Sequence, residues 1–315
     1  MDAFPVDDSV LRQSAGLVDT PGRGALRVTG PERASYLHGM LTNDVEGLSV
    51  GRWTYATACT AKGAMVADCR VLARADELWL DTEPAYGERL LGHLSRFLVS
   101  EDAELHAAPG ERGVLVLVGP AAARVATAAG LPVPDGNAVA EGPGGTWVLQ
   151  HGLYGVPAVE VFVPGSEKEA LRQRLSSAGV PELPLSALEA LRVEAGLPRM
   201  GTDMDEATIP LEANLQRGLH YQKGCYLGQE VIARATFRGQ VNKRLSGLRF
   251  GGALPAPGAE LRKGEKAVGR VTSAVHSPRL GAIGLGYVHR LFLEPGTELE
   301  LPDGSRATVG PLPFA

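Results

Sequence analysis

The sequence predicts an α+β protein that ends in a small β-barrel. Apolar residues recur at helical spacing in some segments and alternate with polar residues in others, so both helices and strands are expected. The 40 glycines and 22 prolines are spread over all 315 residues, which indicates many turns between short strands. Beyond about residue 245, Gly and Pro separate short alternating segments such as 267–275 and 282–288, a pattern typical of a barrel.

The first 110 residues are expected to hold two helices and a group of strands. A helix is predicted over 31–41, because its apolar residues fall on one face. Strands are predicted over 53–59 and 65–73, joined into a hairpin by a short Gly-containing turn, and a third strand over 78–81. Residues 84–99 again carry leucines at helical spacing and predict a second helix.

A second group of elements follows. Strands are predicted over 114–118, 147–150 and 159–163, with a helix over 121–129 between the first two. The resulting β-α-β-β-α order suits a small α+β sandwich. The segment 132–145 mixes Gly and Pro without an apolar period, so we expect a mobile loop there.

Two Ser-x-x-Glu sequences predict where the later helices begin. Ser166 with Glu169, and Ser186 with Glu189, have the spacing of a capping box, in which the serine caps a free N–H and the glutamate reaches back. The second helix is expected to end near Gly196, because glycine readily adopts the left-handed conformation that follows a last helical turn.

Length and charge narrow the possible classes of protein. A chain of 315 residues is too long for one ordinary core, so two or three domains are expected. The formal net charge of −5 argues against a protein whose main task is to grip a phosphate backbone. The sequence has no secretory signal at its start, and its longest aliphatic run is far shorter than the ~20 residues needed to span a bilayer. We therefore expect a cytoplasmic protein without a membrane partner.

The cysteines and histidines do not form a metal-binding pattern. The three cysteines, Cys59, Cys69 and Cys225, include no Cys-x-x-Cys pair, which excludes a zinc knuckle or a self-contained four-cysteine cluster site. The seven histidines are scattered without metal-ligand spacing. No metal site is expected, and in a reducing compartment the cysteines should be thiols.

The most unusual stretch is Lys223-Gly224-Cys225-Tyr226-Leu227-Gly228-Gln229-Glu230. Two glycines bracket a cysteine that stands close to a lysine and ahead of a predicted helix starting near Gln229. A cation and a helix N-terminus both favour the thiolate, so Cys225 is expected to be reactive. The alternative, which the local chemistry leaves open, is a glycine-punctuated turn in which Cys225 is only a small buried residue.

Charge segregates around this stretch. The charged residues of 194–212 are all acidic apart from Arg199, whereas those of 217–249 are all basic apart from Glu230. The basic segment could hold a polyanion, such as RNA or the glutamate tail of a folate. Equally, it could be a solvated surface that pairs with the acidic segment before it.

Two carboxylates are candidate functional residues. Asp68 stands in an apolar predicted strand, where a carboxylate is costly unless it has a partner, so it is either functional or part of a structural pair. Glu194 lies near the end of an amphipathic helix, where a surface salt bridge is the usual role. No GxGxxG in a strand-to-helix context, P-loop or GxSxG sequence is present, so a dinucleotide, NTP or α/β-hydrolase site has no support.

Residues 223–230 match the KGCYxGQE signature of the YgfZ family, folate-binding relatives of the glycine-cleavage aminomethyltransferase, the T-protein. Similarity extends over nearly the whole chain, in the segments 36–45, 62–68, 191–198, 209–212 and 268–273. The resemblance implies a three-domain cloverleaf of the GcvT/YgfZ type around a central folate-binding hole. The expected domains are a discontinuous folate-binding region (1–110 and 184–244), a ferredoxin-like middle domain (111–183) and the C-terminal β-barrel (245–315).

The resemblance also implies roles for individual residues. By position, Asp68 resembles the T-protein carboxylate near the folate N5, where it could stabilise an iminium or move a proton. Glu194 resembles the glutamate that reads the pterin ring, and we assign Arg234 to the same tetrahydrofolate site. Cys225 is expected to be a reactive, catalytic thiol together with Asp68, and the rest of its motif (Lys223, Gly224, Tyr226, Gly228, Gln229 and Glu230) to shape its surroundings.

Three functions are compatible with these features of the sequence. The favoured one is a tetrahydrofolate-binding factor that assists the assembly or repair of iron–sulfur enzymes and so affects tRNA modification, with those enzymes or cluster-assembly proteins as partners. The alternative is an aminomethyltransferase, which is disfavoured because T-proteins usually lack the cysteine and are longer. The third is a non-catalytic RNA-binding module based on residues 217–249, but the acidic net charge argues against direct nucleic-acid binding.

Overall fold

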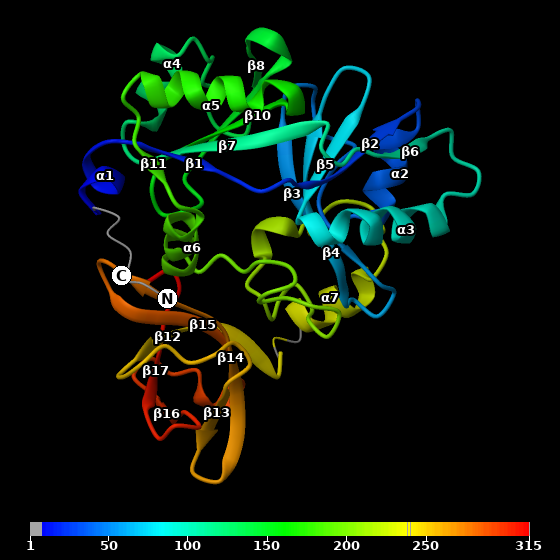
Figure 1. Cartoon of the computed structure of the whole chain (residues 1–315). Helices are drawn as coiled ribbons and strands as arrows, with labels where there is room; N and C mark the ends of the chain where they lie inside the picture. The colour runs from blue at the N-terminus through cyan, green and yellow to red at the C-terminus, as the bar shows by residue number, and fades with distance from the viewer. Residues whose placement is uncertain (1–7, 238, 240, 315) are drawn as a thin grey trace.

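The computed structural model describes residues 8–237, 239 and 241–314 and has three parts, two β-sheets packed on each other and a barrel (Figure 1). The helix α6 (Leu185–Glu194) runs between the sheets and the barrel (Figure 1). This arrangement confirms the α+β class and the C-terminal barrel. Across the described residues, the helices are all too short or too polar to span a lipid bilayer.

The first sheet has five strands in the order β3-β4-β5-β2-β6, all antiparallel to their neighbours. Leucines of the two covering helices, including Leu37, Leu90 and Leu94, fill the core on one face of this sheet. Its elements are β2 (Gly24–Thr29), α2 (Arg33–Met40), β3 (Trp53–Cys59), β4 (Met65–Ala73), β5 (Leu78–Thr82), α3 (Gly87–Phe97) and β6 (Glu104–Ala107).

The strand β4 shows why a carboxylate can stand in an apolar strand. Successive side chains of a strand point to opposite faces of the sheet. Ala67 and Val71 join the core beneath the helices, whereas Leu72 joins the core between the two sheets. Asp68 and Arg70 share the face of Leu72 and line a cavity between the sheets. The strand is therefore apolar on one side and partly polar on the other.

The second sheet has six strands in the order β11-β1-β7-β10-β9-β8. The β1–β11 pair is parallel, and the other neighbours are antiparallel. The helices α4 and α5 cover its outer face (Figure 1). Its elements are β1 (Gly16–Asp19), β7 (Arg112–Val118), α4 (Ala122–Ala128), β8 (Val139–Glu141), β9 (Trp147–His151), β10 (Ala158–Pro164), α5 (Lys168–Ser177) and β11 (Glu182–Leu183).

Large aromatic residues hold the two sheets face to face. Trp79 of β5 meets Trp147 of β9 edge to face, with ring centroids 5.4 Å apart and planes at 81°. Such pairs stabilise by about 0.5–1.5 kcal/mol beyond the burial of their area. Phe162 of β10 and Leu72 of β4 belong to the same buried cluster. This apolar cluster fixes the separation of the sheets. Beside it, charged residues of the two sheets line a common cavity.

The C-terminal part is a closed six-stranded barrel in the order β12-β15-β14-β13-β16-β17. Closure leaves no sheet edge exposed. Its strands are β12 (Lys243–Phe250), β13 (Glu260–Lys263), β14 (Lys266–Ser277), β15 (Gly281–His289), β16 (Glu298–Glu300) and β17 (Arg306–Gly310). The remaining helices are α1 (Asp8–Gln13) and α7 (Gln229–Phe237), with short 3₁₀ turns that include η3 (Gly165–Glu167) and η4 (Gln216–Gly218).

The predicted strands and helices are present, but both predicted capping boxes are wrong. Ser166 lies in the 3₁₀ turn before α5, and Ser186 lies inside α6, which starts one residue earlier; neither helix has a side-chain cap. Glu189 instead pairs with Arg192 and Arg199. The competing partners, two guanidinium groups, offer a carboxylate stronger bonds than a backbone N–H does.

Two short strands depart from the expected organisation. The segment 132–145, expected to be a loop, contains β8 and a 3₁₀ turn at 143–145, and it bonds to the first sheet through Asn137 O and Trp53 N. The strand β1 precedes the whole first sheet in the sequence, yet it pairs with β7 and β11 of the second. The exact domain boundaries stay predictions.

Candidate functional site

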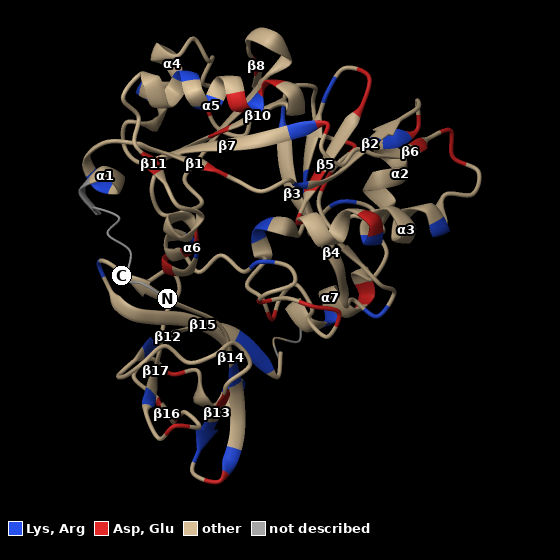
Figure 2. Cartoon of the chain, viewed as in Figure 1, with Lys and Arg blue, Asp and Glu red and all other residues tan. Residues whose placement is uncertain are grey.

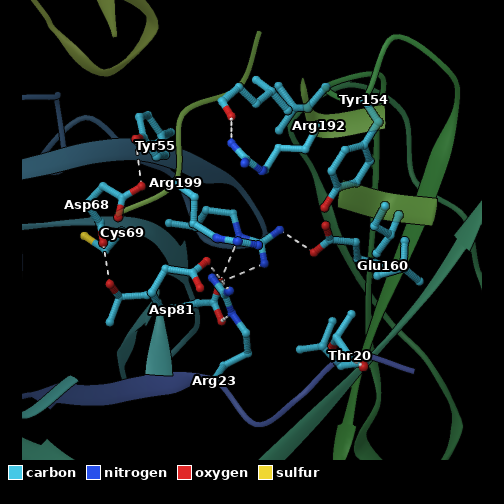
Figure 3. Close-up of a pocket in the computed structure, with 18 of the residues that line it drawn as sticks. Thr20, Arg23, Tyr55, Asp68, Cys69, Asp81, Tyr154, Glu160, Arg192 and Arg199 are labelled. Atoms are coloured by element: carbon cyan, nitrogen blue, oxygen red, sulfur yellow. Dashed lines mark hydrogen bonds and ion pairs between the residues drawn. The ribbon is translucent and has the colours of Figure 1, made fainter. Parts of the chain in front are cut away.

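A cavity of about 210 Å³ lies between the two sheets beside α6 (Figure 3). We call it the Asp68 cavity. Its wall is formed by β4 and β5 on one side, by β7 and β10 on the other, and by α6 and the segment after it. The residues that carry charge or a tyrosine hydroxyl there are Arg23, Tyr55, Asp68, Arg70, Asp81, Glu83, Tyr154, Glu160, Glu189, Arg192, Arg199 and Arg217.

Asp68 has one oxygen engaged and one unpartnered. The Tyr55 hydroxyl donates a hydrogen bond of 2.9 Å to Asp68 Oδ2 (Figure 3). Asp68 Oδ1 is buried and has no hydrogen-bond partner among the described residues. Burial raises the pKa of Asp68 to about 6, although the Tyr55 hydrogen bond and the charge of Arg23 act in the opposite direction. A carboxyl group with this pKa can accept or release a proton near neutral pH.

A chain of ion pairs forms the floor of the cavity. Arg23 pairs with both oxygens of Asp81, at 3.0 and 3.1 Å, and Arg70 donates to Asp81 Oδ2 at 2.7 and 2.9 Å. Arg70 also pairs with Glu160 of the opposite sheet, and His151 lies 2.9 Å from the other oxygen of Glu160. Because every charge has a partner, burial here does not leave an isolated ion.

The carboxylate of Glu160 is ionised in spite of its burial. Only 4% of the residue is exposed, which by itself would raise its pKa. The charges of Arg70 and His151 outweigh this effect and hold the pKa well below its ordinary value. The pairing of Arg70 with carboxylates on both sheets therefore joins the two sheets across the cavity floor.

The third wall comes from α6 and connects the cavity to the barrel. Glu189 accepts hydrogen bonds from Arg192, at 2.6 and 3.0 Å, and from Arg199. Arg192 also donates to Asp203 and to Ser273 Oγ of the barrel strand β14, at 2.6 and 2.8 Å. The orientation of Glu189 in the cavity thus depends on a buried polar network that includes the barrel.

A second cavity, of about 550 Å³, adjoins the first. The two share the lining residues Leu197, Pro198 and Arg217. The other lining residues include Arg244 of the barrel strand β12 and residues 311–313 of the C-terminal segment. Its lining includes two arginines and no acidic residue.

Glu194 does not line either cavity. Its carboxylate accepts a hydrogen bond of 2.5 Å from Ser277 Oγ and lies 3.4 Å from Arg279 Nε, both in the barrel region. Glu194 and Asp68, which the resemblance assigns to one folate site, therefore do not line a common cavity in this structure. The side chain emerges from the last turn of α6, where β14 packs against the helix, and barrel donors engage it. A role for Glu194 in folate binding stays a prediction.

The cysteine motif packs against the hairpin of β3 and β4. Lys223 Nζ donates to three backbone carbonyls at the end of α2, those of His38, Leu41 and Asn43. Burial lowers the pKa of this ammonium group to about 8. The described contacts of Lys223 do not include the Cys225 thiol, so the expected support of a thiolate by this lysine is not observed.

The three cysteines differ in accessibility. Cys225 is exposed but lines neither cavity, whereas Cys59 and Cys69 are buried. Burial raises the pKa of the Cys59 thiol to about 12 and that of Cys69 further still. The alternative interpretation of Cys225 as a buried turn residue is wrong. Its catalytic role stays a prediction.

Gly228 and Glu230 of the motif have defined neighbours in the structure. Gly228 has φ +89°, and a Cβ there would lie 2.6 Å from Thr60 O, so only glycine fits between the motif and the hairpin. Arg234, expected in the folate site, is exposed on α7 and pairs with Glu230 one turn earlier, at 2.6 Å. It lines neither cavity. Figure 2 shows acidic and basic residues interspersed over all three parts of the molecule.

Several cavity residues were not identified from the sequence. Tyr55, Asp81 and Glu160 lack any motif of their own, and Glu189 was assigned only to a capping box. One signal was available for Glu160, which stands in the middle of an apolar predicted strand, as Asp68 does. The sequence does not show that Arg70 and Glu160 face each other, because they stand 90 positions apart.

The chain matches two family models over most of its length. Residues 6–223 match the model described as the GCVT N-terminal domain, and residues 243–315 match the glycine cleavage T-protein C-terminal barrel domain. An aminomethyltransferase of Rubrobacter xylanophilus is 32% identical over 322 residues, covering 98% of this chain and 85% of the relative. One from Listeria monocytogenes is 27% identical, covering 98% and 88%.

A solved structure shows similarity to the same family of proteins. The glycine cleavage system aminomethyltransferase T from Bartonella henselae superposes with a TM-score of 0.88 at 25% sequence identity, covering 97% of this chain and 87% of that one. The expected GcvT-type fold is therefore confirmed.

These findings overturn the favoured function. The interpretation as an iron–sulfur assembly or repair factor is wrong, because relatives that cover nearly the whole chain are named aminomethyltransferase. The matches support the wider family and do not single out its YgfZ branch. By its two domain matches, its full-length relatives and its fold, the chain belongs to the family of the glycine cleavage T-protein.

Proposed function

We propose that the protein is an aminomethyltransferase that moves a one-carbon unit to tetrahydrofolate bound in the Asp68 cavity. The observation that carries this proposal is the carboxyl group of Asp68, which lines the cavity with one buried oxygen left without a partner. An unpartnered buried polar atom is costly unless a ligand completes its hydrogen bonding.

The lining of the cavity suits a reduced folate. Its pterin combines a flat pyrimidine part with a puckered reduced ring and carries several N–H donors, and an ionised carboxylate is an acceptor only. Leu153 and Leu188 supply apolar surface beside the charged floor. Because the floor charges are already paired with each other, Asp68 is the acceptor best placed to bind a donor of the ligand.

The proposed reaction moves a methylene group from a lipoyl-bound aminomethyl group. The carbon–sulfur and carbon–nitrogen bonds of the donor break, and two bonds to folate nitrogens form. The sulfur and the amine each gain a proton, and the two folate nitrogens each lose one, so a thiol and ammonia are released without net oxidation. Asp68 would take up a folate proton and stabilise the positive charge that develops on the transferred carbon.

The proposed partner is a lipoylated carrier protein, in keeping with the glycine cleavage system named for the Bartonella henselae relative. The protein itself would contribute binding, exclusion of water and the proton transfer at Asp68.

The test is an assay for ammonia and methylene-tetrahydrofolate with a lipoylated carrier that bears the aminomethyl group. We expect both products in equal amounts, and Asp68→Asn should lower kcat/KM by about 100-fold. Glu298→Gln is the matched control, because Glu298 also pairs with another residue but lies on the barrel surface, away from the cavity. If wild-type protein forms neither product above background, the proposal is wrong.

A further inference from the structure

We propose that Tyr55 is a positioning residue, which holds one oxygen of Asp68 and leaves the other for the ligand. The part played by Asp68 in the reaction rests on the proposed function, but the positioning itself does not. The inference comes from three contacts of Tyr55: its hydroxyl with Asp68, its ring with η4, and its backbone carbonyl with Asn43.

The hydroxyl of Tyr55 reaches Asp68 across a strand pair. In the register of β3 and β4, Tyr55 lies opposite Arg70 and Asp68 lies opposite Thr57, so Tyr55 and Asp68 are diagonal neighbours on one face. The hydrogen bond from Tyr55 Oη to Asp68 Oδ2 measures 2.9 Å. Burial raises the pKa of Tyr55 well above its ordinary value, so the hydroxyl stays protonated and acts as the donor.

The ring of Tyr55 is held in place by the 3₁₀ turn η4. The guanidinium carbon of Arg217 lies 4.7 Å from the ring centroid, a cation–π arrangement. A Cβ on Gly218 would lie 3.0 and 3.1 Å from two ring carbons, so the glycine permits a close approach that other residues would disturb. The amide of Asn43 ties the two segments together by donating to Tyr55 O, at 2.8 Å, and to Arg217 O, at 3.2 Å.

This packing gives Tyr55 a role that a surface hydroxyl would not have. A ring packed against η4 is restrained from swinging its hydroxyl away, so Asp68 Oδ2 keeps its partner and the carboxyl plane is fixed. Asp68 Oδ1 is the atom left unpartnered. The carboxylate is therefore oriented before any ligand binds, which lowers the cost of ordering it during the reaction.

Removal of the hydroxyl has a predictable effect on the titration of Asp68. The Tyr55 hydrogen bond stabilises the ionised carboxylate and so opposes the upward effect of burial on the pKa. Tyr55→Phe should raise the pKa of Asp68 above its present value of about 6. Among the other groups near Asp68, Arg23 lowers this pKa and Glu83 raises it. The other ionisable residues near the Asp68 carboxyl group are Cys69, Arg70, Asp81, Tyr86, Tyr154, Glu160, Glu189, Arg192, Arg199 and Arg217.

The decisive measurement is the pH titration of the Asp68 carboxyl carbon by NMR in the ligand-free protein, assigned with Asp68→Asn. We expect the midpoint in Tyr55→Phe to move upward by about one pH unit. The matched control is Tyr36→Phe, which also removes a buried tyrosine hydroxyl with a single hydrogen bond, to Leu94 O, but belongs to the core under α2. An unchanged midpoint in Tyr55→Phe would overturn the proposal.

A second variant tests the same idea if Tyr55→Phe does not fold. Gly218→Ala should displace the ring, lengthen the hydrogen bond and move the midpoint in the same direction, by a smaller amount. In the transfer assay, the acidic limb of the kcat/KM profile should shift upward with the NMR midpoint, so that much of the activity returns at high pH. A protein without transfer activity whose NMR midpoint still shifts would refute the proposed function and leave the positioning role standing.

Discussion

Arg192 and Asp203 form a buried ion pair, with Nη1 and Oδ2 2.6 Å apart, where α6 meets the barrel. The other oxygen of Asp203 accepts hydrogen bonds from Thr272 and Ser273 of β14, at 2.5 and 2.7 Å. Arg192 in turn holds Glu189 in the wall of the Asp68 cavity. The barrel therefore contributes to the site through this pair without lining the cavity beside Asp68.

Asp203→Ala should destabilise the protein strongly, because it leaves the buried guanidinium group of Arg192 with Glu189 alone as a charge partner and removes the acceptor of the Thr272 and Ser273 hydroxyls. Removal of one member of a buried pair costs about 3–5 kcal/mol. Denaturant unfolding of both proteins measures the difference. Asp303→Ala removes an exposed aspartate that bonds only within its own turn, and it should leave the unfolding midpoint unchanged. Equal midpoints for all three proteins would contradict this account of the pair.

Asp68→Asn should lower activity and raise stability. The folded pKa of Asp68, about 6, exceeds its ordinary value of 3.8, so the ionised form is penalised in the folded state. This penalty is complete above pH 6 and disappears as the pH falls below 4. At pH 8 the variant should gain up to about 3 kcal/mol in free energy of unfolding. Unfolding curves at pH 8 and pH 4 check the sign, and a gain that persists at pH 4 would need another cause.

Gly228→Ala and Gly224→Ala should differ although both glycines belong to one motif. The first substitution places a Cβ at a position with φ +89° and 2.6 Å from Thr60 O, whereas a Cβ at Gly224 would meet nothing nearer than His38 Nε2 at 3.8 Å. We expect a loss of about 1–3 kcal/mol for Gly228→Ala and little change for Gly224→Ala. Thermal unfolding compares them, and similar melting temperatures would show that the hairpin contact does not constrain the motif.

Cys225 should be alkylated far faster than Cys59 or Cys69 in the folded protein. Cys225 is exposed, whereas the other two are buried and their pKa values are raised. Mass spectrometry after brief treatment with iodoacetamide gives the extent of labelling at each position. In denaturant the three should react alike, and equal labelling without denaturant would place Cys59 and Cys69 outside the core.

Glu194→Gln should act on the barrel contact more than on the ligand. The glutamate accepts from Ser277 and faces Arg279, and loss of its charge should cost about 1 kcal/mol. Because Glu194 does not line the Asp68 cavity, folate affinity should fall less than in Asp68→Asn. Titration with tetrahydrofolate measures the affinity of each of the two variants. A larger loss in Glu194→Gln would return this residue to the pterin site, as its sequence position predicts.

Local pattern was enough to predict much of the fold. The strands 53–59 and 65–73 follow from the pattern of apolar residues, because their spacing records which face of an element is buried. The helix 185–194 was expected from a capping box that this helix does not have. Asp68 was identifiable for the same reason, since a carboxylate breaks the apolar pattern of its strand. The barrel was predictable from the change in Gly and Pro punctuation after residue 245.

Only the tertiary structure decided which side chains meet. Glu194 follows Glu189 by five residues on one helix, yet Glu189 lines the Asp68 cavity and Glu194 contacts the barrel, because the helix presents them to different neighbours. Lys223 stands two residues before Cys225 in the motif but binds backbone carbonyls at the end of α2. Tyr55 and Asp68 meet through strand register, and Arg217 joins them from 162 residues away. Such pairings depend on how elements pack, and the sequence pattern of a single element does not contain that information.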